Sequence, residues 1–218
     1  MLLKILSIGD IVNAMKIFSK ERPSKFFLLA GIITAGLIVA GCTPTPPASA
    51  IAEIGFSHLE KLNVKAESIQ ISSEYKSPLK APFVEHRLPA SPEKAAINWA
   101  KSRLASVGGE TRVRFIIVDA SVREEPVEKQ KTGIVGVFTK EPTADYFANL
   151  EARLIVERTT GKSLGEIRVT AKRNILIHED VSLAERERIW LELVETLMAD
   201  FNGEMESQIR AHLSAFIE

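Results

Sequence analysis

The chain has 218 residues, with 28 basic and 28 acidic side chains and a single cysteine. Residues 1–41 have the order of an export signal, and their removal leaves a net charge of about −3, which argues against a nucleic-acid binding protein. One cysteine excludes a disulfide within the chain, so a domain of this length must be stabilised by packing alone.

The N-terminal region contains an apolar run at residues 26–40 that follows four basic residues. These are Lys16, Lys20, Arg22 and Lys25. A membrane-spanning helix needs about 20 apolar residues, and this run is shorter and interrupted by Gly31 and Gly36. The order of basic and then apolar residues favours a signal peptide over residues 1–41. Met15 opens a basic segment by itself and is an alternative translation start.

Small residues and the cysteine close this run as Val39-Ala40-Gly41-Cys42. The tetrapeptide resembles the lipobox of bacterial lipoproteins. That resemblance implies that the Cys42 thiol receives a diacylglyceryl group, that the chain is cut before Cys42, and that the new N-terminus is acylated, for example by palmitate. The next residue is Thr43. In the familiar sorting rule for such lipoproteins, Asp at this position retains the protein at the inner membrane. By that resemblance, Thr43 implies that the protein is anchored at the periplasmic face of the outer membrane. A plain signal anchor remains the alternative.

The mature chain is predicted to begin with the lipidated Cys42 and a flexible linker over residues 42–61, since the stretch after Cys42 is rich in proline and small residues. A single periplasmic domain over residues 62–218 is then expected. Apolar and polar residues alternate over residues 62–71, as in a strand. The apolar residues are at even positions in the first half and at odd positions in the second, so we predict a bulge near residues 66–68 that brings both pairs to one face. Four prolines make residues 76–92 an extended connector.

Ser91 and Pro92 predict a helix start, and two glycines predict its end after Val107. Residues 112–122 are rich in β-branched side chains and predict a central strand, followed by a charged turn over residues 124–131.

Strict alternation predicts a strand over residues 146–156 that turns at residues 159–162 into a hairpin partner over residues 164–177. Ser182 and Glu185 form a capping-box pattern that opens a long amphipathic helix. Its length predicts that the end beyond Gly203 projects from the sheet.

The predicted fold is α+β, a mostly antiparallel four-stranded sheet with two helices on one face, in the order β-α-β-β-β-α. This order resembles that of small envelope lipoproteins, among them the lipopolysaccharide-assembly lipoprotein that plugs an outer-membrane barrel and auxiliary lipoproteins of ABC-type lipid transporters. The resemblance covers residues 62–216 and is one of element order, so it implies an accessory or assembly role and transfers no site residue.

No pattern of catalytic or metal-binding residues stands out. The closest two histidines are 28 positions apart, which does not suit a metal site. No nucleophile elbow, phosphate loop or dinucleotide fingerprint is present. We therefore expect no enzyme activity, no cofactor and no metal. The alternative is a lipid-anchored hydrolase or carbohydrate-binding module that uses Glu85 and His86, which are adjacent in the connector.

The connector and Tyr75, which directly precedes it and is counted with it below, also carry apolar side chains in a stretch unsuited to a core element. Tyr75, Phe83 and Leu88 either pack along the sheet or contact a partner, and we predict them as candidate partner-contact residues. The sequence thus predicts a non-enzymatic protein held to the membrane by its N-terminal lipid, with an envelope protein as partner and no role in nucleic-acid binding.

Overall fold

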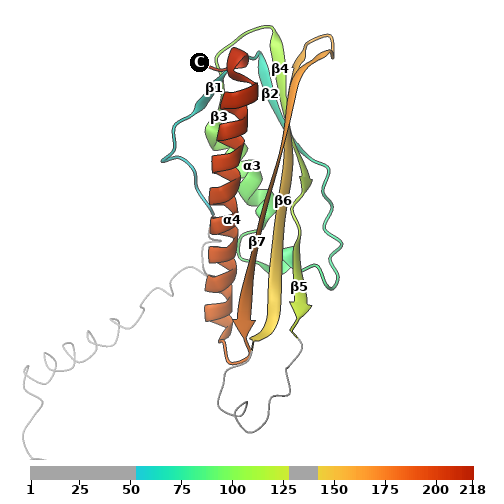
Figure 1. Ribbon diagram of the computed structural model, residues 1–218, viewed down its shortest axis with the longest axis vertical. Helices are drawn as coiled ribbons and strands as arrows, with labels where there is room; N and C mark the ends of the chain where they lie inside the picture. The colour runs from blue at the N-terminus through green and yellow to red at the C-terminus, as the bar shows by residue number, and fades with distance from the viewer. Residues whose placement is uncertain (1–52, 128–141) are drawn as a thin grey trace, which may run out of the picture. The chain divides into compact units, whose positions relative to one another are not determined.

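The computed structural model describes residues 53–127 and 142–218. Their helices and strands are shown in Figure 1. In chain order these are β1 (Leu62–Val64), β2 (Ser68–Ser73), the 3-10 helix η1 (Glu85–Arg87), α3 (Pro92–Arg103), β3 (Leu104–Ser106), β4 (Thr111–Asp119), β5 (Val122–Pro126), β6 (Pro142–Arg158), β7 (Ser163–His178), α4 (Leu183–His212) and the 3-10 helix η3 (Ser214–Phe216).

The main sheet is organised around β6, which has 17 residues and pairs along both of its edges. β7 runs antiparallel to it on one edge over almost its whole length. On the other edge β4 pairs with the C-terminal half of β6 and β5 with the N-terminal half. β2 adds to β4 in parallel. The predicted class, α+β with a mostly antiparallel sheet and two helices, is confirmed, although the main sheet has five strands instead of four.

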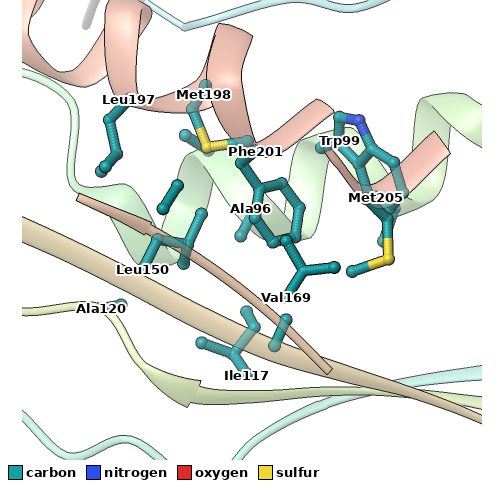
Figure 2. Close-up of a cluster of buried hydrophobic side chains, with 14 of the residues drawn as sticks. Ala96, Trp99, Ile117, Ala120, Leu150, Val169, Leu197, Met198, Phe201 and Met205 are labelled. Carbon is teal, nitrogen blue, oxygen red and sulfur yellow. The ribbon is translucent and has the colours of Figure 1, made fainter. Parts of the chain in front are cut away.

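Both helices bury their apolar stripes against the same face of this sheet. Trp99 on α3 is fully buried and lies with its ring centroid 5.5 Å from Phe115 of β4 and 5.4 Å from Phe201 of α4. Figure 2 shows the side chains that meet in this cluster. Those labelled are Ala96 and Trp99 of α3, Leu197, Met198, Phe201 and Met205 of α4, Ile117, Leu150 and Val169 of the sheet, and Ala120 between β4 and β5.

The predicted helix starts are confirmed by their side-chain caps. The Ser91 hydroxyl accepts the backbone N–H of Lys94 at 3.3 Å, and the Ser182 hydroxyl accepts that of Glu185 at 3.2 Å. Each bond satisfies an amide that the first helical turn would otherwise leave free. The predicted hairpin is confirmed as well, with Gly161 at φ 88 in the turn between β6 and β7.

The prediction of a bulged first strand is wrong. Residues 62–64 and 68–73 belong to two different sheets, since β1 pairs in parallel with β3 while β2 pairs with β4. The parity of the apolar residues changes because the chain passes from one sheet to the other at Ala66, whose N–H bonds to the carbonyl of Val64.

The end of α3 also differs from the prediction, because Leu104–Ser106 leaves the helix to form β3 beside β1. Helical spacing continues to Val107, but the pairing with β1 ends the helix at Arg103.

The C-terminal part of α4 does not project from the domain, so that prediction is wrong. Met205 is fully buried and Ile209 is 1 % exposed. The chain after α4 folds back, and Ile217 forms a bridge with Val64 of β1. Gly165 in β7 leaves room for this end, because a Cβ there would lie 2.7 Å from Cδ2 of Leu213.

The predicted turn over residues 124–131 begins too early, because β5 continues to Pro126. Its edge is covered by the connector, where the Val84 N–H donates to the carbonyl of Val122 and the Glu124 N–H to that of Pro82. The packed part of the chain also reaches further towards the N-terminus than residue 62, since Phe56 is 5 % exposed and belongs to the core.

Candidate functional site

The two faces of β6 have different characters. Tyr146, Ala148 and Leu150 point into the core under the helices. Phe147 and Asn149 alternate with them and therefore lie on the opposite face. Among the described residues this outer face is covered by no helix (Figure 1).

A cavity of about 480 Å³ lies on the outer face where β4 gives way to β5; we refer to it as the outer-face cavity. Its walls come from the connector and from four strands and their junctions. The lining residues are Phe83, Asp119, Ser121, Arg123, Phe147, Ala148, Asn149, Lys172, Arg173 and Asn174.

Strand register explains why these residues meet. Phe83 forms a bridge with Arg123, Arg123 pairs with Phe147, and Phe147 pairs with Asn174. A second row begins at Asn149, which pairs with Lys172. Cross-strand neighbours on one face are about 5 Å apart, so the two rows form a continuous wall.

Asp119 organises the polar side of the outer-face cavity. Its Oδ1 accepts the backbone N–H of Ser121 at 3.0 Å, and its Oδ2 accepts Nδ2 of Asn149 at 2.6 Å. The other side-chain atom of Asn149, Oδ1, is buried and accepts no hydrogen bond from the described residues. A buried amide oxygen without a donor is uncommon in folded proteins and requires an explanation.

A second cavity of about 490 Å³ lies beside the first and shares Phe83 with it. It is formed by residues 79–84 of the connector together with Arg87, Glu124 and Pro126, among others. Leu79 at its rim is 67 % exposed and adopts φ 55. An exposed leucine held in a left-handed backbone conformation is unusual for a branched residue.

The three predicted partner-contact residues fall into different environments. Leu88 is 8 % exposed and belongs to the core. Tyr75 is half-buried, packs against the core and donates its hydroxyl to Glu85 at 2.6 Å. Phe83 is half-buried and lines both cavities. The structure therefore brings only Phe83 to an accessible surface with other polar and aromatic groups.

Glu85 is a buried carboxylate at the centre of the connector, only 3 % exposed. Its Oε1 accepts the hydroxyls of Tyr75 and Ser77, and its Oε2 accepts the N–H of Val122 at 3.3 Å. Burial by itself would raise the pKa of Glu85, but the hydrogen bonds from Ser77 and Tyr75 outweigh it and hold the pKa below the ordinary value. Burial and the bond to Glu85 raise the pKa of Tyr75 far above its ordinary value.

His86, the other residue of the predicted acid-base pair, is exposed on η1. The oxygens of Glu85 are engaged by Tyr75, Ser77 and Val122, so the structure does not join Glu85 and His86 in one site. The arrangement ties the connector to β5 and does not present a carboxylate to a substrate.

The histidines at positions 58, 86, 178 and 212 are all exposed and far apart in the chain. Within residues 53–127 and 142–218, no three His, Cys, Asp or Glu side chains are grouped so that they could hold a metal ion. In the same ranges no helix combines the length and the hydropathy required to cross a bilayer.

The predicted lipidation site at Cys42 lies outside the described residues, as do Thr43 and the whole predicted signal peptide. The outer-face cavity, in contrast, was not anticipated from the sequence. The local sequence feature that points to it is the pair Phe147 and Asn149. These two residues lie on the face of the strand opposite to the apolar face formed by Tyr146, Ala148 and Leu150.

The fold and the cavities together define a small α+β domain with both helices on one face of the sheet and two adjoining cavities, one of them on its outer face. No family model matches the chain, and no curated protein matches it.

Solved structures similar to the chain include the rare lipoprotein B from Shewanella oneidensis (13 % identity, 66 % of this chain and 96 % of that chain covered, TM-score 0.35). A minor lipoprotein from Acinetobacter baumannii has 11 % identity, coverage of 68 % and 93 %, and a TM-score of 0.35. An uncharacterized lipoprotein B from Nitrosomonas europaea has 13 % identity, coverage of 67 % and 81 %, and a TM-score of 0.32. These neighbours are bacterial lipoproteins, and at such TM-scores the likeness carries no argument about function.

Proposed function

We propose that this protein is a non-enzymatic lipoprotein, anchored through Cys42 at the periplasmic face of the bacterial envelope, where it acts as an accessory or assembly factor for a membrane complex or for lipid or lipopolysaccharide transport. The observation that carries the proposal is the order of the N-terminal region. Basic residues, an apolar run and the tetrapeptide Val39–Cys42 come in the sequence of a lipoprotein export signal. Phe56, the first core residue, follows Cys42 by only 14 positions.

The absence of an assembled catalytic group among residues 53–127 and 142–218 supports a binding role over an enzymatic one. Glu85, the one carboxylate of the connector, is engaged by hydrogen bonds from Tyr75, Ser77 and Val122. A hydrolase that used Glu85 and His86 would need the carboxylate to be free for a substrate or a water molecule. For this reason we do not favour the hydrolase alternative.

The concave surface formed by the connector and the outer face of the sheet supports the proposed accessory role. Phe83 joins the two cavities, and the outer face carries no helix of the described chain that would shield it. Concave surfaces that combine aromatic side chains with a few polar groups are typical binding sites.

The first test is lipid labelling of Cys42. Cells grown with a palmitate analogue are expected to label the parent protein and not Cys42→Ser, because only the thiol can accept the diacylglyceryl group. Thr43→Ala serves as the matched control, since it changes the neighbouring residue and leaves the thiol in place. Equal label on the parent and on Cys42→Ser would refute the proposed anchor.

The second test separates the two membranes by density. The parent protein is expected in the outer-membrane fraction, and Thr43→Asp is expected to move to the inner-membrane fraction. If the parent protein is found in the inner-membrane fraction, the proposed accessory role is retained and the proposed location is corrected to the inner membrane. If it is found free in the periplasm, the anchored role is wrong.

A further inference from the structure

The hydrogen-bonding groups of the outer-face cavity are mostly engaged within the protein, and this limits what the cavity can bind. Both oxygens of Asp119 accept hydrogen bonds from Ser121 and Asn149. The Asn174 amide donates to Asp145 at 3.1 Å. One buried acceptor at the cavity wall, Oδ1 of Asn149, receives no hydrogen bond from the described residues.

The basic side chains at the cavity differ in whether they have an acidic partner within the protein. Arg173 forms a two-pronged ion pair with Asp200 of α4. Arg123 lies 3.0 Å from Glu125 and has its guanidinium carbon 5.9 Å from the ring centre of Phe147. Lys172 is exposed and makes no hydrogen bond or ion pair with any residue in the described ranges. Within the described part of the chain it therefore offers a positive charge without a counter-ion, directly opposite Asn149 in the pairing of β6 with β7.

The remaining walls of the cavity are apolar. Phe147 and Phe83 are both half-buried and flank Arg123 in the row of cross-strand neighbours. The cavity volume of about 480 Å³ lies within the range of sites that hold a ligand of a few residues in size. Oδ1 of Asn149, the ammonium group of Lys172 and the rings of Phe83 and Phe147 are thus available to a ligand of the cavity.

We infer that the outer-face cavity binds an acidic, extended peptide segment of an envelope protein, with a carboxylate of the segment at Lys172, a backbone N–H at Asn149 and an apolar side chain against the neighbouring ring of Phe147. The inference rests on the proposed accessory function and names the chemistry of its partner. An extended peptide offers a donor, a charged side chain and an apolar side chain within a few residues of one another. A sugar would need several free donors and acceptors for its hydroxyl groups, and both carboxylate oxygens of Asp119 and the amide nitrogen of Asn174 are already engaged.

The experiment is site-specific photocrosslinking in the source bacterium with the full chain. A benzophenone amino acid is placed at Asn174, which lines the cavity, and in a matched control at Thr170, which lies on the same face of β7 outside it. We expect a protein adduct from position 174 at least about fivefold stronger than from position 170. Mass spectrometry of the adduct is expected to identify a linked peptide that contains Asp or Glu.

Capture of a protein does not by itself support the inference, so a charge exchange completes the test. Lys172→Glu is expected to reduce the adduct from position 174 at least about tenfold at unchanged protein abundance. Lys162→Glu, an exposed lysine in the β6–β7 turn, is expected to leave it unchanged. Substitution of the acidic residue of the linked peptide by Lys is expected to restore the adduct with Lys172→Glu.

Four outcomes would overturn the inference. They are no adduct from position 174, an adduct that Lys172→Glu leaves unchanged, a linked peptide without an acidic residue, and an adduct to a polysaccharide or a lipid. Each of these leaves the proposed anchor untouched, because label on Cys42 is measured separately. Loss of that label would instead refute the anchored role, whatever the crosslinks show.

Discussion

The phenol of Tyr75 donates a 2.6 Å hydrogen bond to the buried carboxylate of Glu85, ten residues further along the connector. Ser77 donates to the same oxygen, and the N–H of Val122 reaches the other. One carboxylate thus closes the connector into a loop and attaches that loop to the start of β5. Phe83 is part of this loop and lines both cavities, so the hydrogen bonds of Glu85 also position the Phe83 side chain in the cavity walls.

Replacement of Glu85 by Ala is expected to destabilise the protein by about 2 to 3 kcal/mol, because it leaves buried donors without an acceptor. Glu85→Gln keeps an acceptor oxygen and is expected to lose only about 1 kcal/mol. Urea unfolding followed by the fluorescence of the two tryptophans measures both values. A cost below about 0.5 kcal/mol for Glu85→Ala would mean that the loop does not depend on this carboxylate.

The contribution of Glu85 should also depend on pH. Its pKa in the folded protein is below the ordinary value of 4.5, so folding favours the charged form. The stabilisation is fully present above the unfolded pKa and is lost as the pH falls through the folded pKa. The difference in stability between the parent protein and Glu85→Gln is therefore expected to shrink as the pH is lowered from 6 to 3. A difference that stays constant over this range would contradict the assignment.

The two tryptophans are expected to respond differently to the same substitution. Trp99 donates its indole N–H to Asn202 at 2.8 Å, whereas the N–H of the buried Trp190 has no partner among the described residues. Replacement of either by Ala should cost about 3 to 5 kcal/mol. Replacement by Phe should cost about 1 to 2 kcal/mol at Trp99 and less at Trp190, because only Trp99 loses a hydrogen bond.

Urea unfolding followed by far-ultraviolet circular dichroism measures these losses without relying on the tryptophans themselves. Trp190→Phe is the matched control for Trp99→Phe, since both remove an indole N–H from a buried site. Equal costs for the two Phe variants would show that the bond to Asn202 contributes nothing measurable.

Arg103 is a buried cation that links α3 to α4. It is 2 % exposed, donates its Nε–H to Asn202 at 3.1 Å and forms an ion pair with Glu206. Glu206→Ala is expected to cost about 3 kcal/mol, since it leaves a buried charge without its counter-ion. Arg210→Ala removes the other arginine that binds Glu206, but Arg210 is exposed, so a loss below about 0.5 kcal/mol is expected.

Thermal and urea unfolding of the two variants give the comparison directly. If Glu206→Ala and Arg210→Ala cost the same, the burial of Arg103 has no energetic consequence and the ion pair acts as a surface pair.

Substitutions of Phe83 and Leu88 by Ser are expected to have different effects, one on function in cells and the other on stability. Leu88→Ser should cost about 2 to 4 kcal/mol because Leu88 lies in the core. Phe83→Ser should cost less than about 1 kcal/mol, since Phe83 is only half-buried. It should nevertheless fail to restore the permeability barrier in bacteria that lack the gene, measured with a detergent or a large antibiotic. Full complementation by a stable Phe83→Ser protein would place the partner surface elsewhere.

Much of the secondary structure could be predicted from local sequence, because its causes are local. Ser91 and Ser182 accept N–H groups three residues further on, and the alternation of β6 follows directly from the two-residue repeat of a strand. The turn between β6 and β7 needs a positive φ, which Gly161 supplies. These features depend on residues that are neighbours in the chain.

Other features could not be predicted from local sequence, because they depend on residues that are far apart in the chain. Leu104 leaves a helical pattern because β1, about 40 residues earlier, offers free backbone groups to pair with. Glu85 reads as a solvated loop residue until the fold brings Val122 and Tyr75 to its oxygens. Lys172 faces Asn149 only through the register of β6 and β7. The helix caps and the apolar faces of the strands and helices could be predicted from local sequence, while the register of strands distant in the chain sets which polar side chains meet on the outer face.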